Sequence, residues 1–137
     1  MSWGASLLRK LTRKPAATLG ERGERAAAAY LRRHGHRILG KNLRNRLGEI
    51  DLLALDRRTG AVVIVEVKTT RGDDPPPEIH VNPAKQRKLT SLAGQLARQH
   101  RLGDRTIRFD VIGIVWAQDQ PRPTRITHHA NAFDAAF

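Results

Sequence analysis

The chain has 137 residues, and its 25 Lys and Arg against 13 Asp and Glu give a formal net charge of +12. This length is typical of one domain, and a hydrophobic content of 39% argues against wholesale disorder. Because the sequence contains no cysteine, it excludes a disulfide scaffold, a thiolate zinc site, an iron–sulfur cluster and a cysteine nucleophile.

The excess of positive charge favours an anionic partner, which is most often nucleic acid and less often an anionic membrane surface. No apolar run approaches the roughly 20 residues of a membrane span, and the first residues lack the apolar core of a signal peptide. We therefore expect a cytoplasmic protein that binds nucleic acid and no membrane. A basic solvated surface without such a partner is the alternative.

Residues 1–19 are a basic segment in which no acid precedes Glu21. We expect a flexible tail that contacts nucleic acid, followed by one domain over residues 20–137. The basic residues of the tail are Arg9, Lys10, Arg13 and Lys14.

Hydrophobic periodicity predicts seven elements in the order αβββαββ. A first helix is expected over residues 20–34, and Asn82-Pro83 starts a second helix that runs to about Arg101. A short polar link at residues 57–60 predicts a hairpin, and the proline-rich residues 71–82 predict a loop. The expected strands are Arg37–Leu43, Glu49–Leu55, Val62–Lys68, Thr106–Trp116 and Thr124–His128. This order indicates an α/β fold with a mixed sheet flanked by helices.

The strand VVIVEVK places an acid where a buried side chain is expected. By alternation, Glu66 and Lys68 share one face with Ile64. A buried carboxylate is costly unless a cation or a metal ion compensates its charge. A plain ion pair between Glu66 and Lys68 is the alternative.

The preceding strand carries a second acid, Asp51, among apolar residues. If the hairpin turns between residues 58 and 59, Asp51 and Glu66 each lie seven residues from the turn and become cross-strand neighbours. Two adjacent carboxylates repel unless a divalent cation lies between them, and oxygen ligands of this kind suit Mg²⁺ or Mn²⁺. Lys68 could then orient a water molecule or stabilise a developing oxyanion.

A third acid, Glu24, is spaced by helical turns from Ala27 and Leu31, so it lies beside the face that packs on the sheet. Glu21, one turn earlier, could take the same place as Glu24. The alternative for Glu24 is that it is a first-turn acid that complements the helix dipole. Asp110 is expected to have a structural role, paired with a basic group such as Arg108 or with a helix residue. The six histidines lack zinc-site spacing, and no GxSxG or P-loop motif is present.

The short segments GEID and VEVK, which contain the acids Asp51 and Glu66, resemble the PD-(D/E)xK nuclease signature. With GERGERAAAAYLRRHGHRIL, AKQRKL and RFDVIGI, they make residues 20–134 similar to the YraN-like family. These are small bacterial proteins of restriction-endonuclease-like fold that resemble archaeal Holliday-junction resolvases. The resemblance implies that Glu24, Asp51 and Glu66 bind metal, that Asp51, Glu66 and Lys68 are catalytic, and that Gln86 is accessory.

These features together predict a Mg²⁺- or Mn²⁺-dependent DNA endonuclease. Lys85, Arg87, Lys88 and the basic tail would hold the phosphates. Only six aromatic residues are present, so double-stranded or branched DNA is favoured over single strands. A non-catalytic nucleic-acid-binding protein of the same fold and a ribonuclease are the alternatives. We also expect a homodimer on DNA, with residues 130–137, including Phe133 and Phe137, as a candidate contact.

Overall fold

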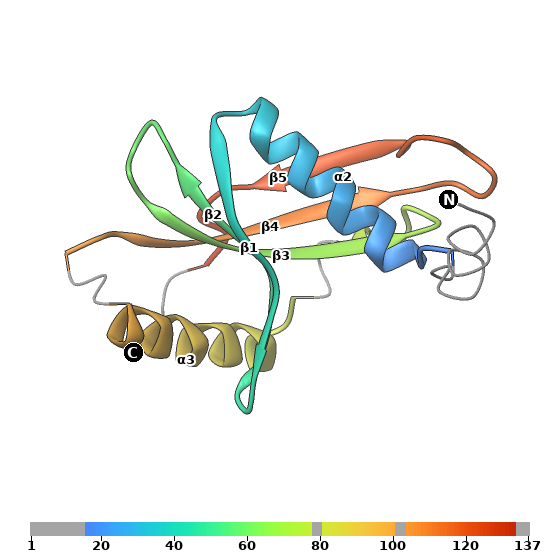
Figure 1. The fold of residues 1–137 in the computed structure, drawn as a ribbon. Helices are drawn as coiled ribbons and strands as arrows, with labels where there is room; N and C mark the ends of the chain where they lie inside the picture. The colour runs from blue at the N-terminus through green and yellow to red at the C-terminus, as the bar shows by residue number, and fades with distance from the viewer. Residues whose placement is uncertain (1–15, 78–80, 101–103, 134–137) are drawn as a thin grey trace, which may run out of the picture.

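The computed structural model describes residues 16–77, 81–100 and 104–133. The described elements follow the predicted order, and their bounds agree with the predicted ones within two residues (Figure 1). The helices are α2 (Leu19–Arg33) and α3 (Pro83–Gln99). The strands are β1 (His36–Asn45), β2 (Gly48–Asp56), β3 (Val62–Thr70), β4 (Ile107–Val115) and β5 (Arg125–His129).

The strands form one open, mixed sheet in the order β1-β2-β3-β4-β5. Neighbouring strands are antiparallel except β3 and β4, which are parallel and joined through α3. The predicted hairpin between β2 and β3 is confirmed, because Leu52 pairs with Val65 and Leu55 with Val62. The described part of the chain is therefore a mixed α/β fold with a five-stranded sheet.

The two faces of the sheet bury different side chains of the same strand. Val63 and Val65 pack with Leu31 of α2, whereas Ile64 packs with Leu89 of α3. The two helices accordingly lie on opposite faces of the sheet (Figure 1). The predicted alternation in VVIVEVK is confirmed, so Glu66 belongs to the face that α3 covers.

The N-terminal turns of both helices are fixed by side-chain caps. Thr18 and Glu21 form a capping box at α2, so Glu21 is used at the cap of the helix. Asn82 accepts a hydrogen bond from the Lys85 backbone N–H at 2.9 Å, which holds Lys85 in the first turn of α3.

Helix α2 approaches β3 closely at one glycine. A Cβ at Gly23 would lie 1.8 Å from Oγ1 of Thr69, far inside van der Waals contact. The absence of a side chain at Gly23 therefore allows the start of α2 to rest on the end of β3.

The C-terminal part of the described chain returns to its own domain. Phe133 stacks on Phe109 with ring centroids 4.7 Å apart, so it packs against the core of its own domain. A dimer contact through this segment stays a prediction. Phe137 and the four basic tail residues lie outside the described residues. Within the described ranges, neither helix is both long and apolar enough to cross a membrane.

Candidate active site

Asp51 and Glu66 come together at the point where β2 leaves β3. The paired positions end at Leu52 and Val65, and the next residues in the same register are Asp51 and Glu66. Beyond that point the Val67 backbone N–H donates to Oδ2 of Asp51 at 2.8 Å. The Asp51 side chain thus takes the place of a backbone acceptor, and the predicted neighbourhood of the two acids is confirmed.

The two acids compete for a proton. Glu66 is only 2% exposed, and burial, followed by the nearby charge of Asp51, raises its pKa to about 7. Burial also raises the pKa of Asp51, although the hydrogen bond from the Val67 N–H and the charge of Lys85 oppose that shift. Near neutral pH, the pair therefore favours any cation that stabilises its ionised form.

Two lysines supply positive charge to Glu66. Nζ of Lys85 lies 3.0 Å from Oε1 of Glu66, and Nζ of Lys68 lies 4.0 Å from the same oxygen. Partial burial, the largest single effect, lowers the pKa of Lys85. The hydrogen bond to Glu66 and the charges of the nearby carboxylates together outweigh burial and leave this pKa above its ordinary value. The sequence predicted a phosphate contact for Lys85 and missed its place beside Glu66. The Asn82-Pro83 cap fixes the first turn of α3, and it was the sequence feature that could have indicated the position of Lys85.

Two further acids, Glu24 and Glu49, lie near the Asp51–Glu66 pair. Burial, followed by the charge of Asp51, raises the pKa of Glu24, against a hydrogen bond from Asn42. With its amide nitrogen turned toward the acids, Asn42 donates to Oε2 of Glu24 at 2.9 Å and to Oε1 of Glu49 at 3.3 Å. The sequence predicted Glu24 near the site but singled out neither Asn42 nor Glu49.

Part of this arrangement suits a divalent metal ion. Oε2 of Glu66 is buried and has no hydrogen-bond partner within the described chain, so one carboxylate oxygen is left for a further ligand. Across the three described ranges, however, no three Asp, Glu or His side chains converge closely enough to enclose a metal ion. Asp51 and Glu66 therefore form a two-carboxylate donor set, which Glu24 does not complete in this structure.

The other predicted residues surround α3. Gln86 donates from Nε2 to the Val81 carbonyl at 3.2 Å, and it lines a hollow beside Val111, whose position pairs with Glu66. Arg87 and Lys88 are exposed in the first turns of α3. These basic residues thus lie on the helix that also carries Lys85, and contact with phosphate stays a prediction.

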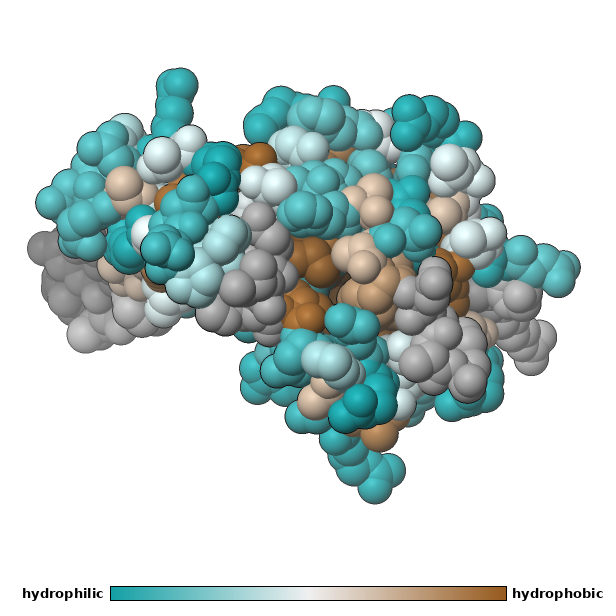
Figure 2. Space-filling view, turned by 180° about the vertical axis from the view of Figure 1, so that it is seen from behind, coloured by the Kyte–Doolittle hydropathy of each residue, from teal (hydrophilic) through white to brown (hydrophobic). Residues whose placement is uncertain are grey.

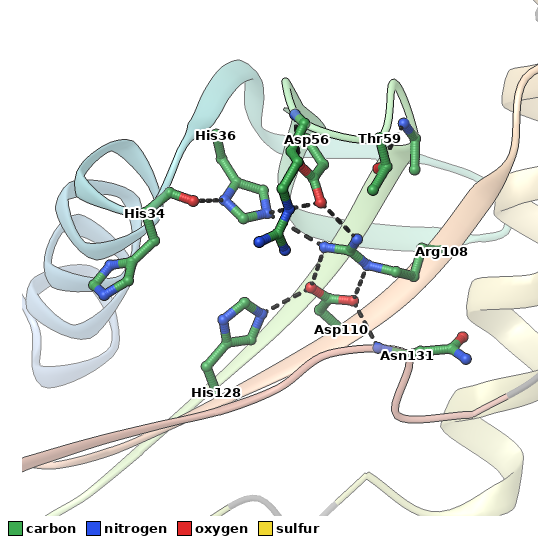
Figure 3. A network of polar contacts seen from close by, with 10 residues as sticks. His34, His36, Asp56, Thr59, Arg108, Asp110, His128 and Asn131 are labelled. Carbon is green, nitrogen blue, oxygen red and sulfur yellow. Dashed lines mark hydrogen bonds and ion pairs between the residues drawn. The ribbon is translucent and has the colours of Figure 1, made fainter.

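Asp110 belongs to a separate polar network on the α2 face (Figure 3). Arg108 donates to both oxygens of Asp110 at 2.9 and 3.0 Å, which confirms the predicted ion pair. Arg108 also donates to Asp56 at 2.8 Å, and this hydrogen bond, against burial, lowers the pKa of Asp56 to about 2. His128 contacts Asp110 at 2.7 Å and packs edge-on against Tyr30 of α2. Because Asp110 pairs with Val65, the network lies on the opposite face of the sheet from Glu66.

Residues 23–114 match the model of the uncharacterised protein family UPF0102. The chain belongs to the UPF0102 family. A UPF0102 protein of Geobacter metallireducens is 44% identical over 122 residues, which are 88% of this chain and 95% of the relative. A UPF0102 protein of Rhodopirellula baltica is 43% identical over 122 residues, 87% of this chain and 72% of the relative. The resemblance to the YraN-like family is thereby confirmed at the level of the UPF0102 family. The matched segment of this UPF0102 protein spans Glu24, Asp51, Glu66 and Lys85.

Proposed function

We propose that this UPF0102 protein is a Mg²⁺- or Mn²⁺-dependent DNA endonuclease with a restriction-endonuclease-like fold. The observation that supports it most is the buried pair of Asp51 and Glu66, with Lys68 and Lys85 beside it. The order αβββαββ and the divergence of β2 from β3 at these acids agree with the resemblance to PD-(D/E)xK nucleases.

Asp51 and Glu66 would hold the metal ion, because Mg²⁺ and Mn²⁺ prefer carboxylate oxygens and Oε2 of Glu66 has no other partner in the described chain. A metal held there would lower the pKa of a water molecule and would neutralise charge on the attacked phosphate. The Val67 N–H keeps Asp51 in one orientation, so one ligand is fixed before any ion binds.

Lys68 and Lys85 would have different roles in the reaction. Lys68, with a side chain 36% exposed, can reach a phosphate, orient the attacking water and stabilise negative charge on the phosphoryl oxygens. The water oxygen would lose a proton to solvent and form a bond to phosphorus, while the bond to the leaving sugar oxygen breaks and that oxygen takes up a proton from solvent. Lys85 lies on Glu66 and acts as a positioning residue that favours the ionised carboxylate.

A cleavage assay tests this proposal. Protein is incubated with duplex, flap, four-way junction and single-stranded DNA and with RNA, in Mg²⁺ and in EDTA. We expect Mg²⁺-dependent cuts in duplex or branched DNA that Asp51→Asn and Glu66→Gln abolish, while DNA affinity stays within about threefold. Asp104→Asn, at an exposed position, is the control. Cleavage at the wild-type rate by either site variant contradicts the proposal, and cuts confined to RNA identify a ribonuclease.

A non-catalytic nucleic-acid-binding protein is the second candidate. It is favoured by the ion pair between Lys85 and Glu66, which supplies an internal cation where a nuclease would use a metal, and by the incomplete ligand set. Titration with Mn²⁺ distinguishes the two, since a nuclease site binds the ion and Glu66→Gln weakens that binding. No Mn²⁺ binding together with retained DNA affinity supports the second candidate.

We further propose that the active form on branched DNA is a homodimer, because one chain carries one Asp51–Glu66 pair and paired cuts need two. Sedimentation with and without a four-way junction tests this. A strict 1:1 complex that still makes paired cuts contradicts it.

A further inference from the structure

The turn between β1 and β2 presents an apolar side chain at the end of a projecting hairpin. Leu47 is 46% exposed, and the turn extends beyond α3 at the bottom of the molecule (Figure 1). Single exposed leucines are common on protein surfaces. Leu47 differs because it lies at the tip of a projection with Arg46 directly beside it.

The tip is held by local hydrogen bonds and by a contact with α3. The Leu47 backbone N–H donates to Oδ1 of Asn45 at 2.8 Å, which closes the turn. The Asn45 amide donates to Oε1 of Gln95 at 2.7 Å, and a Cβ at Gly48 would lie 3.5 Å from Leu92. A tip anchored to a helix loses little conformational freedom when it inserts into a partner.

The charge around the tip suits a polyanion. Lys41, Arg44 and Arg46 are exposed along the hairpin, and Arg44 also contacts Glu49 at 3.2 Å. In Figure 2, the lower end of the molecule is mainly hydrophilic, with only a small hydrophobic surface. Basic side chains around one apolar residue are typical of proteins that wedge a leucine between DNA base steps.

Lengths along two elements give similar estimates of the distance from the tip to the acid pair. Leu47 precedes Asp51 by four residues along β2, which is about 13 Å at the rise of a strand. Gln95, which holds the tip, follows Lys85 by ten residues of α3, or about 15 Å at the rise of a helix. Both lengths correspond to roughly four base steps of duplex DNA.

We propose that the β1–β2 turn is a wedge that inserts Leu47 into duplex DNA about four base steps from the phosphate at Asp51 and Glu66. The inference rests on the proposed function for the position of the phosphate, while the wedge itself depends only on DNA binding. Its preferred ligand is a duplex in which stacking is already weakened by a nick, a mismatch or a branch, because insertion there avoids the cost of unstacking an intact step.

The test uses the full chain in EDTA, so that binding is measured without cleavage. The probes are two 30-base-pair duplexes of one sequence, one intact and one with a central nick, each carrying 2-aminopurine near the centre. We expect wild-type protein to bind the nicked duplex about tenfold more tightly than the intact one and to increase 2-aminopurine fluorescence. Leu47→Ala should lose both effects, while its affinity for the intact duplex stays within about twofold.

Leu39→Ala is the matched control, because Leu39 has the same 46% exposure on β1 but lies away from the turn. Thermal melting verifies that both variants fold. The wedge is overturned if Leu47→Ala keeps the preference, if Leu39→Ala loses it equally, or if wild-type protein has no preference.

A lipid surface replaces DNA as the partner if Leu47, but not Leu39, is needed for sedimentation with phosphatidylserine vesicles. Loss of cleavage with the preference intact counts against the proposed nuclease and leaves the wedge standing.

Discussion

Lys85 of α3 and Glu66 of β3 form an ion pair of 3.0 Å across two elements that only the β3–α3–β4 crossover brings together. The pair lies beside Asp51, so the state of one carboxylate depends on a neighbouring acid and a neighbouring ammonium at once. Lys85 lowers the pKa of Glu66, whereas burial and Asp51 raise it.

Replacement of Lys85 by methionine should move the pH dependence of metal binding upward. Without the ammonium, the pKa of Glu66 rises further above about 7, so a proton competes more strongly with the ion. We expect Mn²⁺ affinity about three- to tenfold weaker at pH 7 and restored toward wild type by pH 9. Calorimetric titrations at several pH values measure this. Lys88→Met, at an exposed position on the same helix, should leave the profile unchanged.

Replacement of Glu66 by glutamine should stabilise the metal-free protein at high pH. The pKa of Glu66 is about 7 when folded and near 4.5 when unfolded, so the folded state binds the proton more tightly. The free energy of unfolding of the wild type therefore falls as the pH rises from about 4.5 to about 7, by on the order of 2–3 kcal/mol. Glu66→Gln removes this dependence.

Urea unfolding in EDTA at pH 4.5 and pH 8 tests the prediction, with Asp104→Asn as control. The advantage of Glu66→Gln over wild type should be largest at pH 8. A variant less stable than wild type by the same amount at both values would show that the ion pair with Lys85 is the main role of Glu66.

Replacement of Arg108 by methionine should destabilise the fold without altering the acid pair of the site. It leaves Asp56 and Asp110, which are 3% and 1% exposed, without their shared cation. We expect a loss of about 3–5 kcal/mol in the free energy of unfolding at pH 7. Because Arg108 lowers the pKa of Asp56 to about 2, its contribution is lost as the pH falls below about 4, and the difference should shrink by pH 3.

Denaturant unfolding at pH 7 and pH 3 measures this difference, and Arg105→Met at an exposed position is the control. Mn²⁺ affinity of the folded Arg108→Met protein should equal that of wild type. A weaker affinity would show that the network and the Asp51–Glu66 pair are coupled.

Replacement of Gly23 by alanine should destabilise the contact between α2 and β3. The added methyl group would overlap Thr69, with Oγ1 at 1.8 Å and Cβ at 2.8 Å, so side-chain rotation alone cannot relieve it. We expect a loss of about 1–3 kcal/mol. Gly20→Ala is the matched control, since its nearest neighbour is 4.0 Å away, and it should gain up to about 1 kcal/mol from helix propensity. Thermal melting of the two variants should therefore shift in opposite directions.

The sequence predicted the acid pair because the information was local. The link at residues 57–60 fixed the turn, alternation fixed the face, and counting from the turn placed Asp51 opposite Glu66. The ion pair of Arg108 with Asp110 was predictable for the same reason, since residues two apart on a strand share a face.

Contacts between distant segments were not predictable in this way. The partnership of Lys85 with Glu66 depends on where the crossover sets α3 on the sheet. The approach of Asn42 to Glu24 and Glu49 depends on a register shift between Ile38 and Gly40, which no periodicity reveals. Asp56 and His128 likewise reach Arg108 and Asp110 only through strand order.

The open sheet leaves two edges, and their composition bears on aggregation. Along the outer strand β1, exposed Arg37, Lys41 and Arg44 give the edge a positive charge, and the strand is irregular at Ile38. The opposite edge, β5, has only five residues. Two copies that approached through β1 would bring like charges together, so the sheet is protected against growing from chain to chain. If a second copy joins this protein on DNA, it should do so without extending the sheet.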